Sequence, residues 1–459
     1  GHTVEYTNLS YVLASVLFIL GIKKLSHPKT ARDGNFIASF GMLIAIIATL
    51  ISYGKIDFQM IAIGMIIGAI IGATFAIKVE MTQMPQMVAI FNGFGGGASA
   101  LVAAAEFLKT GEITTFTLGT IIVSIFVGTL TFTGSFIAFG KLQGFISGQP
   151  VVFPGQQVIN ALLALCLLAI GFYVVQSPAE MNYFYAVIAI SAILGITLTI
   201  PIGGADMPVV ISLLNSYSGI AAASTGFVLM NNGLIIAGAL VGASGLILTN
   251  IMCKGMNRSL ANVIFGAVGL VQESSGDGTA RQINIKSYST EEAAMIFDAA
   301  EKIIVVPGYG LAVAQAQHAV REVAEFLESK DKQVLYAIHP VAGRMPGHMN
   351  VLLAEANISY EQLKDLDEIN PEFEDCDVAL VLGANDVVNP AARHDTSSPI
   401  YGMPILDVDK SRTVIINKRT MNTGFAGIQN ELFGFDNSIM VFGDAKEMLQ
   451  QLLKDLKDL

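Results

Sequence analysis

The stretch Lys302–Ala314, KIIVVPGYGLAVA, indicates the fold of the C-terminal part of the chain. Its apolar first half predicts a buried strand over Lys302–Val306, and Leu311–Leu327 follows with a helical pattern. Four more apolar runs predict strands and one predicts a final helix: Gln333–Ile338, Asp377–Leu382, Thr413–Ile416, Ile439–Phe442 and Ala445–Leu456. Apolar strands that alternate with helices indicate an α/β, Rossmann-like domain with a doubly wound parallel sheet.

The turn after the first strand carries a glycine pattern typical of dinucleotide sites. Gly308 is expected to allow a tight turn, and Gly310 to let the backbone approach a pyrophosphate. Val313 or Ala314 takes the place of a third glycine, where helix and strand touch. The pattern alone is weak, but its position between a strand and a helix favours a dinucleotide-binding site.

Two features bear on which dinucleotide this domain binds. An NAD site would carry an acidic residue at the end of the second strand, where this chain has Ile338-His339-Pro340. A ribose 2′-phosphate needs cations instead, and Lys418 and Arg419 follow the fourth predicted strand. The pair therefore predicts an NADP site, and the alternative is that it only forms a solvated surface.

Three loops at the expected strand ends are rich in Gly, Pro, Asn and Asp: His339–Asn350, Gly383–Asn389 and Lys418–Gln429. Such loops offer backbone donors and acceptors to a phosphate or an amide. His339 and His348 have no Cys or His at metal-site spacing, so we expect structural roles or cofactor contacts for them and no metal site. No Ser/His/Asp or paired-carboxylate pattern stands out, which indicates that a cofactor carries the chemistry.

Composition separates this domain from the rest of the chain. Of 459 residues, 53% are hydrophobic and 14% are charged, against about 25% charged in an ordinary soluble domain, and the mean hydropathy is +0.60. Residues 259–459 carry 29 of the 37 acidic side chains. The net charge of −11 argues against nucleic acid as a partner, because phosphates need clustered Lys and Arg. The three cysteines lack the spacing of a disulfide framework or a zinc site.

Nine apolar stretches approach the about 20 residues that a hydrocarbon core of roughly 30 Å requires. They lie at 8–24, 36–52, 58–77, 84–106, 116–139, 158–175, 182–201, 207–230 and 232–253. With the N-terminus outside, the external loops carry only Lys55 and Lys109, whereas the cytoplasmic loops carry eight Lys and Arg, a clear positive-inside bias. We therefore expect a polytopic α-helical membrane domain of nine transmembrane helices at 1–258, a linker at 259–285 and a cytoplasmic dinucleotide-binding domain at 286–459.

Polar residues inside these stretches are candidates for a proton or ion path, because a polar group in the hydrocarbon core needs a partner or water. They are Asn92, Asp206, Asn215, Ser216, Ser218 and Ser244. Two simpler interpretations remain open. Asp206 could cap the helix that follows it, and Asn92 and Asn215 could bond neighbouring helices.

Glycines at every fourth position predict close helix packing. These stripes are Gly64, Gly68 and Gly72 in one stretch and Gly238 and Gly242 in another. The cluster within Gly93–Gly97 instead predicts a bent or mobile segment, because each glycine weakens a helix by roughly 1 kcal/mol relative to alanine.

Five segments of the C-terminal domain closely resemble the NADP(H)-binding domain of the proton-translocating nicotinamide nucleotide transhydrogenase family. They are Pro307–Gln317 (PGYGLAVAQAQ), Ile338–Glu355 (IHPVAGRMPGHMNVLLAE), Gly383–Pro390 (GANDVVNP), Lys418–Gln429 (KRTMNTGFAGIQ) and Gly443–Lys446 (GDAK). Three segments of the membrane half look like the β subunit of that family: Gly203–Val210 (GGADMPVV), Leu214–Gly219 (LNSYSG) and Met256–Ser259 (MNRS). The resemblance covers essentially the whole chain.

The resemblance implies an NADP(H) site built from these segments. Its expected members are Gly308, Tyr309, Gly310, Val313, Ala314, His339, Val341, Ala342, Gly343, Arg344, Met345, Pro346, Gly383, Ala384, Asn385, Asp386, Val387, Lys418, Arg419, Thr420, Met421, Asn422, Thr423, Gly424, Phe425, Asp444 and Ala445. In that family the cofactor binds in reversed orientation, so Gly308–Val313 would face the nicotinamide half. Lys418 and Arg419 would then hold the 2′-phosphate, and Asp386 resembles the family's acidic residue that links proton movement to cofactor binding.

The resemblance further implies the β subunit of a proton pump in a bacterial inner membrane, active only with an α subunit. Hydride would pass between NADH, bound by the α subunit, and NADP⁺ on this chain, and a proton would cross the lipid bilayer. The α subunit would also supply additional transmembrane helices, and the complex would be a homodimer of αβ units. The rival interpretation is an ion channel or transporter gated by an NADP(H)-sensing Rossmann domain.

One departure from the family and one coupling route complete these expectations. Some relatives carry a histidine at the place of Asn92, whereas all six histidines here lie outside the apolar stretches. The titrating group would then come from the α subunit. Coupling would pass through Arg258 and residues 259–285, with the loops His339–Gly347 and Lys418–Gly427 acting as lids.

Overall fold

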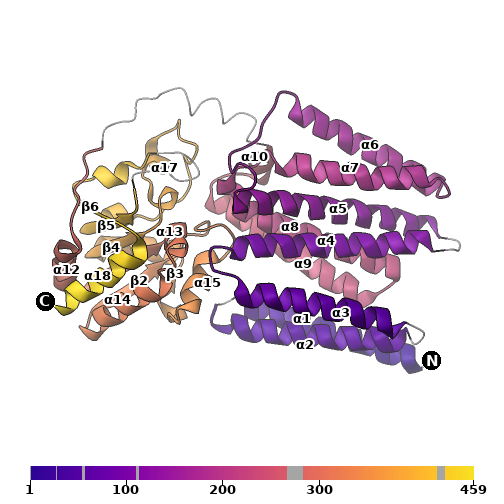
Figure 1. Ribbon diagram of the computed structural model, residues 1–459, viewed down its shortest axis with the longest axis horizontal. Helices are drawn as coiled ribbons and strands as arrows, with labels where there is room; N and C mark the ends of the chain where they lie inside the picture. Colours follow the sequence, from indigo (N-terminus) through magenta and orange to yellow (C-terminus); the bar gives the residue numbers. More distant parts are fainter. Residues whose placement is uncertain (1, 27, 54–56, 110–112, 266–282, 421–428) are drawn as a thin grey trace.

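The computed structural model describes residues 2–26, 28–53, 57–109, 113–265, 283–420 and 429–459. Within them, long helices form one half of the molecule, and a sheet with its covering helices forms the other half (Figure 1). The N-terminus lies at the far end of the helical half and the C-terminus at the far end of the sheet domain (Figure 1). The two halves therefore lie end to end (Figure 1).

Nine helices in the described residues are long and apolar enough to span a membrane. They are α1 (His2–Leu25), α2 (Ala31–Ser52), α3 (Phe58–Lys78), α4 (Met84–Leu108), α5 (Thr115–Gln143), α6 (Gln156–Gln176), α7 (Met181–Thr199), α8 (Met207–Leu229) and α9 (Asn232–Gly255). Each predicted apolar stretch overlaps one of these helices, so the prediction of nine spans is confirmed. The short helix α10 (Leu260–Phe265) follows α9.

Helix α8 is enclosed by α4, α5 and α9, and glycines set its distance to α9. A Cβ on Gly219 would lie 2.5 Å from the Gly242 nitrogen, and a Cβ on Gly238 would lie 2.6 Å from the Gly219 oxygen. Neither position has room for a larger residue, because backbone atoms cannot give way. The predicted packing role of Gly238 and Gly242 is therefore confirmed.

The other glycine stripe behaves differently. A Cβ on Gly64, Gly68 or Gly72 of α3 would meet no described atom within 4 Å, so the packing predicted for this stripe does not occur within the described part of the chain. The cluster Gly93–Gly97 lies in the continuous helix α4, where a Cβ on Gly96 would lie 2.7 Å from the Thr131 Cβ of α5. These glycines thus serve close packing of α4 on α5, which replaces the predicted bend.

The C-terminal domain is built on a parallel sheet whose six strands within the described residues run in the order β3-β2-β1-β4-β5-β6. The strands are β1 (Lys302–Pro307), β2 (Gln333–Ala337), β3 (Leu363–Lys364), β4 (Val378–Leu382), β5 (Thr413–Lys418) and β6 (Ser438–Phe442). The order reverses between β1 and β4, and in open α/β sheets ligands bind at the carboxyl ends of the strands at such a switch point. The predicted Rossmann-like fold is confirmed.

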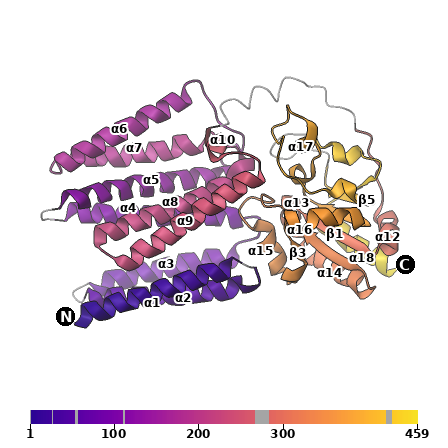
Figure 2. The ribbon, with the colours of Figure 1, turned by 180° about the vertical axis from the view of Figure 1, so that it is seen from behind.

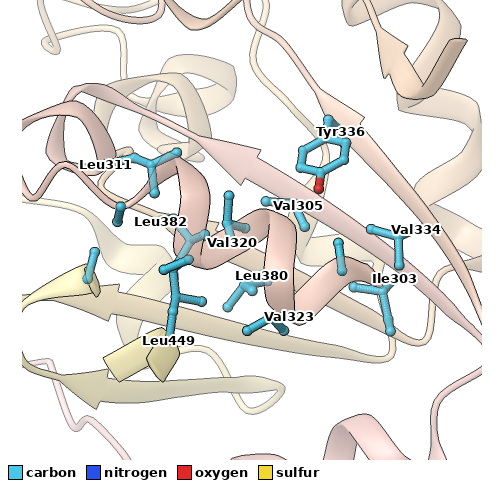
Figure 3. Packing of buried hydrophobic residues seen from close by; sticks show 14 of the residues in the cluster. Ile303, Val305, Leu311, Val320, Val323, Val334, Tyr336, Leu380, Leu382 and Leu449 are labelled. Carbon is cyan, nitrogen blue, oxygen red and sulfur yellow. The ribbon is translucent and has the colours of Figure 1, made fainter. Parts of the chain in front are cut away.

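Apolar clusters cover both faces of this sheet. One face packs against α12 (Thr290–Ala299), α13 (Tyr309–Val313), α14 (Gln317–Ser329), α15 (His348–Glu355) and α18 (Ala445–Lys457). Figure 3 shows Val320 and Val323 of α14 and Leu449 of α18 lying over strand residues such as Leu380. The second face is covered by the short helix α16 (Leu366–Ile369) and by residues of the loops after β4 and β5. The short helix α17 (Ala391–His394) lies in the first of these loops, and its Ala392 packs in a separate cluster with Met403 and Ile405.

Several local features differ from the sequence prediction. The helix predicted over Leu311–Leu327 is two helices, α13 and α14. Helical structure is interrupted between them, where Gln315 takes a positive φ of 53°. Helix α12 and the two-residue strand β3 were not predicted. The start of α12 has a capping box, in which Ser289 and Glu292 bond each other's backbone N–H, and this pattern is readable in the sequence.

Candidate functional site

The turns at the carboxyl ends of β1 and β4 touch each other at the switch point. The Gly308 N–H donates to the Leu382 oxygen (2.9 Å), and the Gly310 N–H donates to the Gly383 oxygen (3.1 Å). A Cβ on Gly308 would lie 2.5 Å from the Ala384 Cα, and one on Gly310 would lie 2.6 Å from the Gly383 Cα. The glycines thus permit contact between the two turns, and Gly308 is extended (φ −135°, ψ −173°), which corrects the predicted tight turn.

The third position of the glycine pattern is taken by one of its two candidates. Val313 is 48% exposed at the end of α13, whereas Ala314 packs against the apolar cluster between helices and sheet. Ala314 therefore makes the helix–sheet contact that the pattern requires, and Val313 does not.

A cation, a carboxylate and a second cation gather at this end of the sheet. The guanidinium of Arg344 lies over the Tyr309 ring, 3.9 Å from its centroid, and the Lys418 ammonium lies 5.0 Å from the centroid of Phe433. Burial lowers the pKa of Arg344 to about 10 and also lowers the pKa of Lys418. The negative charge of Asp386 partly opposes both shifts. Three loops that are far apart in sequence thus bring two cations to one carboxylate.

The second predicted cation has a partner on the neighbouring strand end. Arg419 is exposed, and its guanidinium pairs with the Asp444 carboxylate at 3.0 Å. The other oxygen of Asp444 accepts the Glu447 N–H and caps α18, whose first residue, Ala445, is buried. Thr420 is exposed next to Arg419, and the predicted site residues Met421, Asn422, Thr423, Gly424 and Phe425 lie outside the described residues.

Two buried histidines brace the loop 340–347 at its ends. The His339 Nε2–H donates to the Pro404 oxygen (2.6 Å), and its Nδ1 accepts the Val341 N–H (3.2 Å). The His348 Nε2–H donates to the Met81 oxygen (2.7 Å), and its Nδ1 accepts the Arg344 N–H (3.0 Å). Burial lowers the pKa of His339 to about 4 and lowers that of His348. Both imidazoles are therefore neutral and structural, which favours this alternative over cofactor contact.

The other residues of this loop contact both the sheet domain and the membrane domain. Ala342 and Met345 are buried, Gly343 has a φ of 92° with no room for a side chain beside His348, and Pro346 is half-buried. Val341 packs against Val209, Met252, Cys253 and Val263 at the ends of α8, α9 and α10. The loop that borders the cation–carboxylate group therefore also rests on the membrane domain.

The loop after β4 contributes the remaining predicted residues. Ala384 and Val387 are buried in the apolar cluster on the second face of the sheet. The Asn385 oxygen accepts the side-chain N–H of Asn430 (3.0 Å), and Asp386 begins a short 3₁₀ turn. The strand end thus presents Asp386 toward the two cations, while its neighbours hold the turn in place.

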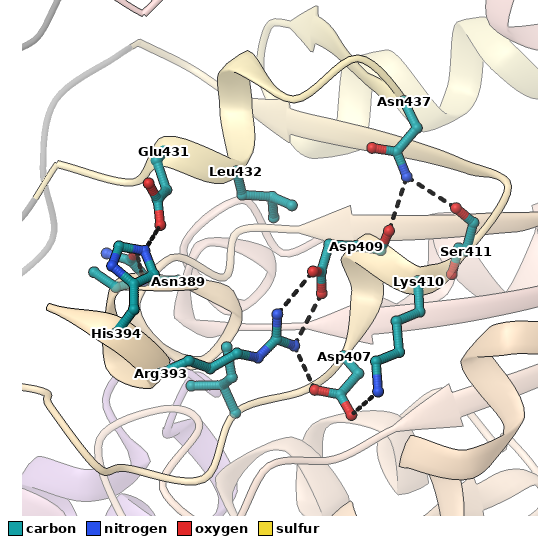
Figure 4. A network of polar contacts seen from close by, with 12 residues as sticks. Asn389, Arg393, His394, Asp407, Asp409, Lys410, Ser411, Glu431, Leu432 and Asn437 are labelled. Atoms are coloured by element: carbon teal, nitrogen blue, oxygen red, sulfur yellow. Dashed lines mark hydrogen bonds and ion pairs between the residues drawn. The ribbon is translucent and has the colours of Figure 1, made fainter.

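An ion-pair network fixes the longer loop that carries Pro404. Arg393 bonds Asp407 and, through both terminal nitrogens, Asp409 (2.7 and 2.9 Å), and hydrogen bonding to Asp409 is the main cause of its raised pKa. Figure 4 shows Arg393 between these two carboxylates. Asn437 beside β6 donates to the backbone oxygens of Asp409 and Ser411 (both 2.9 Å). The acceptor of the His339 bond is therefore held by a rigid loop.

In the membrane domain, the predicted polar residues fall into two groups. Asn92 on α4 donates to the Ile211 oxygen of α8 (3.4 Å), and a Cβ on Gly95 would lie 2.6 Å from the Ser218 Oγ. Asn215 is half-buried on α8, and Ser216 donates to the Gly242 oxygen of α9 (2.7 Å). Three of these polar residues lie on α8 and Asn92 reaches α8 from α4, whereas Ser244 is exposed on α9 and does not join them.

Asp206 and Arg258 form an ion pair at the ends of α8 and α9. The Arg258 Nη1 lies 2.7 and 2.9 Å from the two Asp206 oxygens. Burial raises the pKa of this carboxyl, and Arg258 opposes the shift. Asp206 precedes α8, but its side chain makes no capping bond, so the predicted cap is replaced by the pair with Arg258.

A group of hydroxyls in the bundle was missed from the sequence. The Ser124 and Thr225 hydroxyls hydrogen-bond each other at 2.5 Å and lie 3.4 and 3.2 Å from the Ser99 oxygen of α4, so that one hydroxyl donates to the other and the second donates to this oxygen. They continue the α4–α8 contact beyond Gly95 and Ser218. Single Ser and Thr residues are common in membrane helices, so their sequence positions gave no signal. Among the described residues, no group of three or more His, Cys, Asp or Glu lies together in a way that fits a metal.

Comparison with known proteins agrees with this architecture. The family model for the NAD(P) transhydrogenase beta subunit matches residues 7–455. Two curated proteins from Rhodospirillum rubrum, one of them from a defined strain, are each named NAD(P) transhydrogenase subunit beta and are 51% identical to this chain. Each alignment covers 98% of this chain and 99% of the relative. The match includes both the helical half and the sheet domain, and the chain therefore belongs to the family of NAD(P) transhydrogenase beta subunits.

Proposed function

We propose that the carboxyl edge of the sheet in this chain binds NADP(H), and that a partner α subunit binds NAD(H). Bound nucleotides supply the hydride that passes between them. The chain's own residues hold and orient the NADP(H) and exclude water from it. The single observation that carries this proposal is the gathering of Arg344, Asp386 and Lys418 at the switch point of the sheet.

The donor set fits a phosphorylated dinucleotide. Lys418 and Arg419 offer two cations at the end of β5, and charge-assisted bonds from such groups are the strong contacts to a phosphate. Tyr309 offers an aromatic face at the end of β1. The resemblance of this segment to the transhydrogenase family implies that the nicotinamide half of NADP(H) lies there. The described residues at the end of β2 carry no carboxylate that would accept a bond from a ribose 2′-OH.

We further propose that hydride transfer is coupled to proton translocation. The bond of Asn92 to the Ile211 oxygen and the close approach of the Ser218 hydroxyl to Gly95 place polar groups between α4 and α8, and they support a path through the bundle. The pair Asp206–Arg258 lies where this path would reach the sheet domain. One proton that crosses about 200 mV releases roughly 4.6 kcal/mol, enough to shift a nucleotide ratio by on the order of 10³.

We also propose a location and a partner for this chain. The eight Lys and Arg of the expected cytoplasmic loops support a sheet domain in the cytoplasm and the chain in a bacterial inner membrane. The name beta subunit supports an α subunit as partner, and we propose a dimer of αβ units. A channel that only senses NADP(H) is not favoured, because the family is named for transfer between nucleotides.

The test is calorimetric titration of residues 283–459 with NADPH, NADP⁺, NADH and 2′-dephosphorylated NADPH. The fragment begins at Ile283 because Ile283 packs on the sheet domain and Lys286 and Tyr288 hydrogen-bond Met440 of β6. We expect tight binding that requires the 2′-phosphate and that Lys418→Ala weakens by about 1.5–3 kcal/mol. Lys454→Ala, which removes an exposed lysine from α18, is the matched control and should bind as the wild type does. Equal affinity for NADH would overturn the assignment.

A further inference from the structure

His348 joins the two domains by a hydrogen bond between segments 267 residues apart in the sequence. It is the first residue of α15, its side chain is fully buried, and its Nε2–H donates to the Met81 oxygen at 2.7 Å. Met81 lies in the loop between α3 and α4, and its side chain packs against the apolar cluster of the sheet domain. In Figures 1 and 2, α15 lies on the side of the sheet domain that faces the long helices.

The other ring nitrogen of His348 reaches the candidate nucleotide site. Nδ1 accepts the N–H of Arg344, whose guanidinium lies on the Tyr309 ring and close enough to Asp386 to be stabilised by its charge. Because Gly343 has no side chain, the His348 ring fits directly beneath this loop. One imidazole thus contacts the backbone of Arg344 on one side and the membrane domain on the other.

On the membrane side, the bond is made just before a helix that carries a candidate proton-path residue. Met81 precedes α4 by three residues, and Asn92 lies eight residues into that helix, roughly 12 Å along its axis. Asn92 bonds the Ile211 oxygen of α8. A packed helix moves as a rigid element, so a displacement at its first turn also displaces Asn92 relative to α8.

We propose that His348 is the positioning residue that couples the NADP(H) loop to α4. When the loop around Arg344 changes its position on nucleotide binding, His348 transmits the change to Met81 and so to the contact between Asn92 and α8. The coupling is reciprocal, so the state of the α4–α8 contact also changes the affinity of the loop for the nucleotide. This inference rests on the proposed NADP(H) site and on proton-coupled hydride transfer.

The two ring nitrogens can be tested separately by two amide substitutions. His348→Asn places an acceptor oxygen near the position of Nδ1, which keeps the bond to Arg344 and removes the bond to Met81. His348→Gln places a donor nitrogen near the position of Nε2, which keeps the bond to Met81 and removes the bond to Arg344. His318→Asn changes an exposed histidine of α14 and is the matched control.

The experiment uses the full chain assembled with its α subunit in vesicles. We expect both His348→Asn and His348→Gln to lower the number of protons moved per hydride by half or more, because each variant breaks one of the two bonds through which the change would pass. NADPH affinity should stay within about twofold of the wild type in His348→Asn and should fall in His348→Gln, and His318→Asn should match the wild type in both measurements. A wild-type ratio in either His348 variant would refute the proposal. If the wild type itself moves no protons during hydride transfer, the proposed function fails instead.

A second measurement does not depend on turnover. Hydrogen exchange of the amides at 79–86 is followed in the assembled protein with and without NADPH. We expect NADPH to change exchange there by at least threefold in the wild type and in His318→Asn, and to have no effect in His348→Asn or His348→Gln. An unchanged response in either His348 variant would show that the effect of the nucleotide reaches α4 by another route, and would overturn the role assigned to His348.

Discussion

Acid should destabilise the sheet domain through His339. Its side chain is 2% exposed, its Nε2–H donates to the Pro404 oxygen and its Nδ1 accepts the Val341 N–H. Because Nδ1 must stay unprotonated to accept this bond, the folded protein accommodates only the neutral imidazole. Burial lowers the pKa of this group from 6.5 to about 4. Above pH 6.5 the imidazole is neutral in the folded and the unfolded state. As the pH falls from 6.5 toward 4, only the unfolded chain takes up the proton.

The size of the effect follows from this difference in pKa. Each pH unit between the two values costs about 1.4 kcal/mol of unfolding free energy, so a change from pH 7 to pH 5 removes about 2 kcal/mol. The full shift corresponds to roughly 3 kcal/mol. That is a large fraction of the stability of a typical domain, which is on the order of 5–15 kcal/mol.

The assay is equilibrium urea unfolding of residues 283–459 between pH 5 and pH 7.5, with His339→Asn as the comparison. The Asn oxygen can still accept the Val341 N–H, but the side chain does not titrate. We expect the wild type to lose about 2 kcal/mol more than the variant between pH 7 and pH 5. Other groups, His348 included, titrate in both proteins and cancel in the difference. Parallel curves would refute the argument that His339 is held neutral.

Two further predictions concern close backbone contacts. Gly310→Ala should lower the unfolding free energy of residues 283–459 by about 1–3 kcal/mol, because its Cβ would lie 2.6 Å from the Gly383 Cα, and an unchanged urea midpoint would contradict the contact. Gly238→Leu should lower the thermal midpoint of the full chain in detergent by several degrees, because α9 could no longer approach α8. Gly64→Leu is its matched control on α3, where no described atom lies within 4 Å, and equal losses in the two variants would argue against the α8–α9 contact.

The elements that the sequence predicted well are those set by local pattern. The nine helices follow from apolar length alone, and the central strands follow from continuous apolar runs that both faces of the sheet bury. Strand β3 has two residues, too few to form a pattern. The break between α13 and α14 was missed because Ala314–Ala316 contains no Gly or Pro, although Gln315 adopts a positive φ.

The candidate site was predictable in its loops and less so in its contacts. The cations Lys418 and Arg419 and the acidic Asp386 stand in recognisable motifs, so their positions at the strand ends could be expected. The bond between His348 and Met81 could not, because a backbone oxygen leaves no trace in the sequence and the two residues are far apart along the chain. Ser244 was misplaced because one polar residue on an apolar helix does not indicate which side faces the bundle.

The glycine contact at the switch point has a genetic consequence. At Gly308, Gly310 and Gly383 an added Cβ would lie within 2.6 Å of backbone atoms of the opposite turn. Each of these residues is already the smallest that a codon can specify. A larger residue at one of these positions cannot be compensated by a smaller one at another. In a screen for revertants of Gly310→Ala, intragenic suppressors should therefore be absent from Gly308 and Gly383, and should instead alter the residues that set the spacing between β1 and β4.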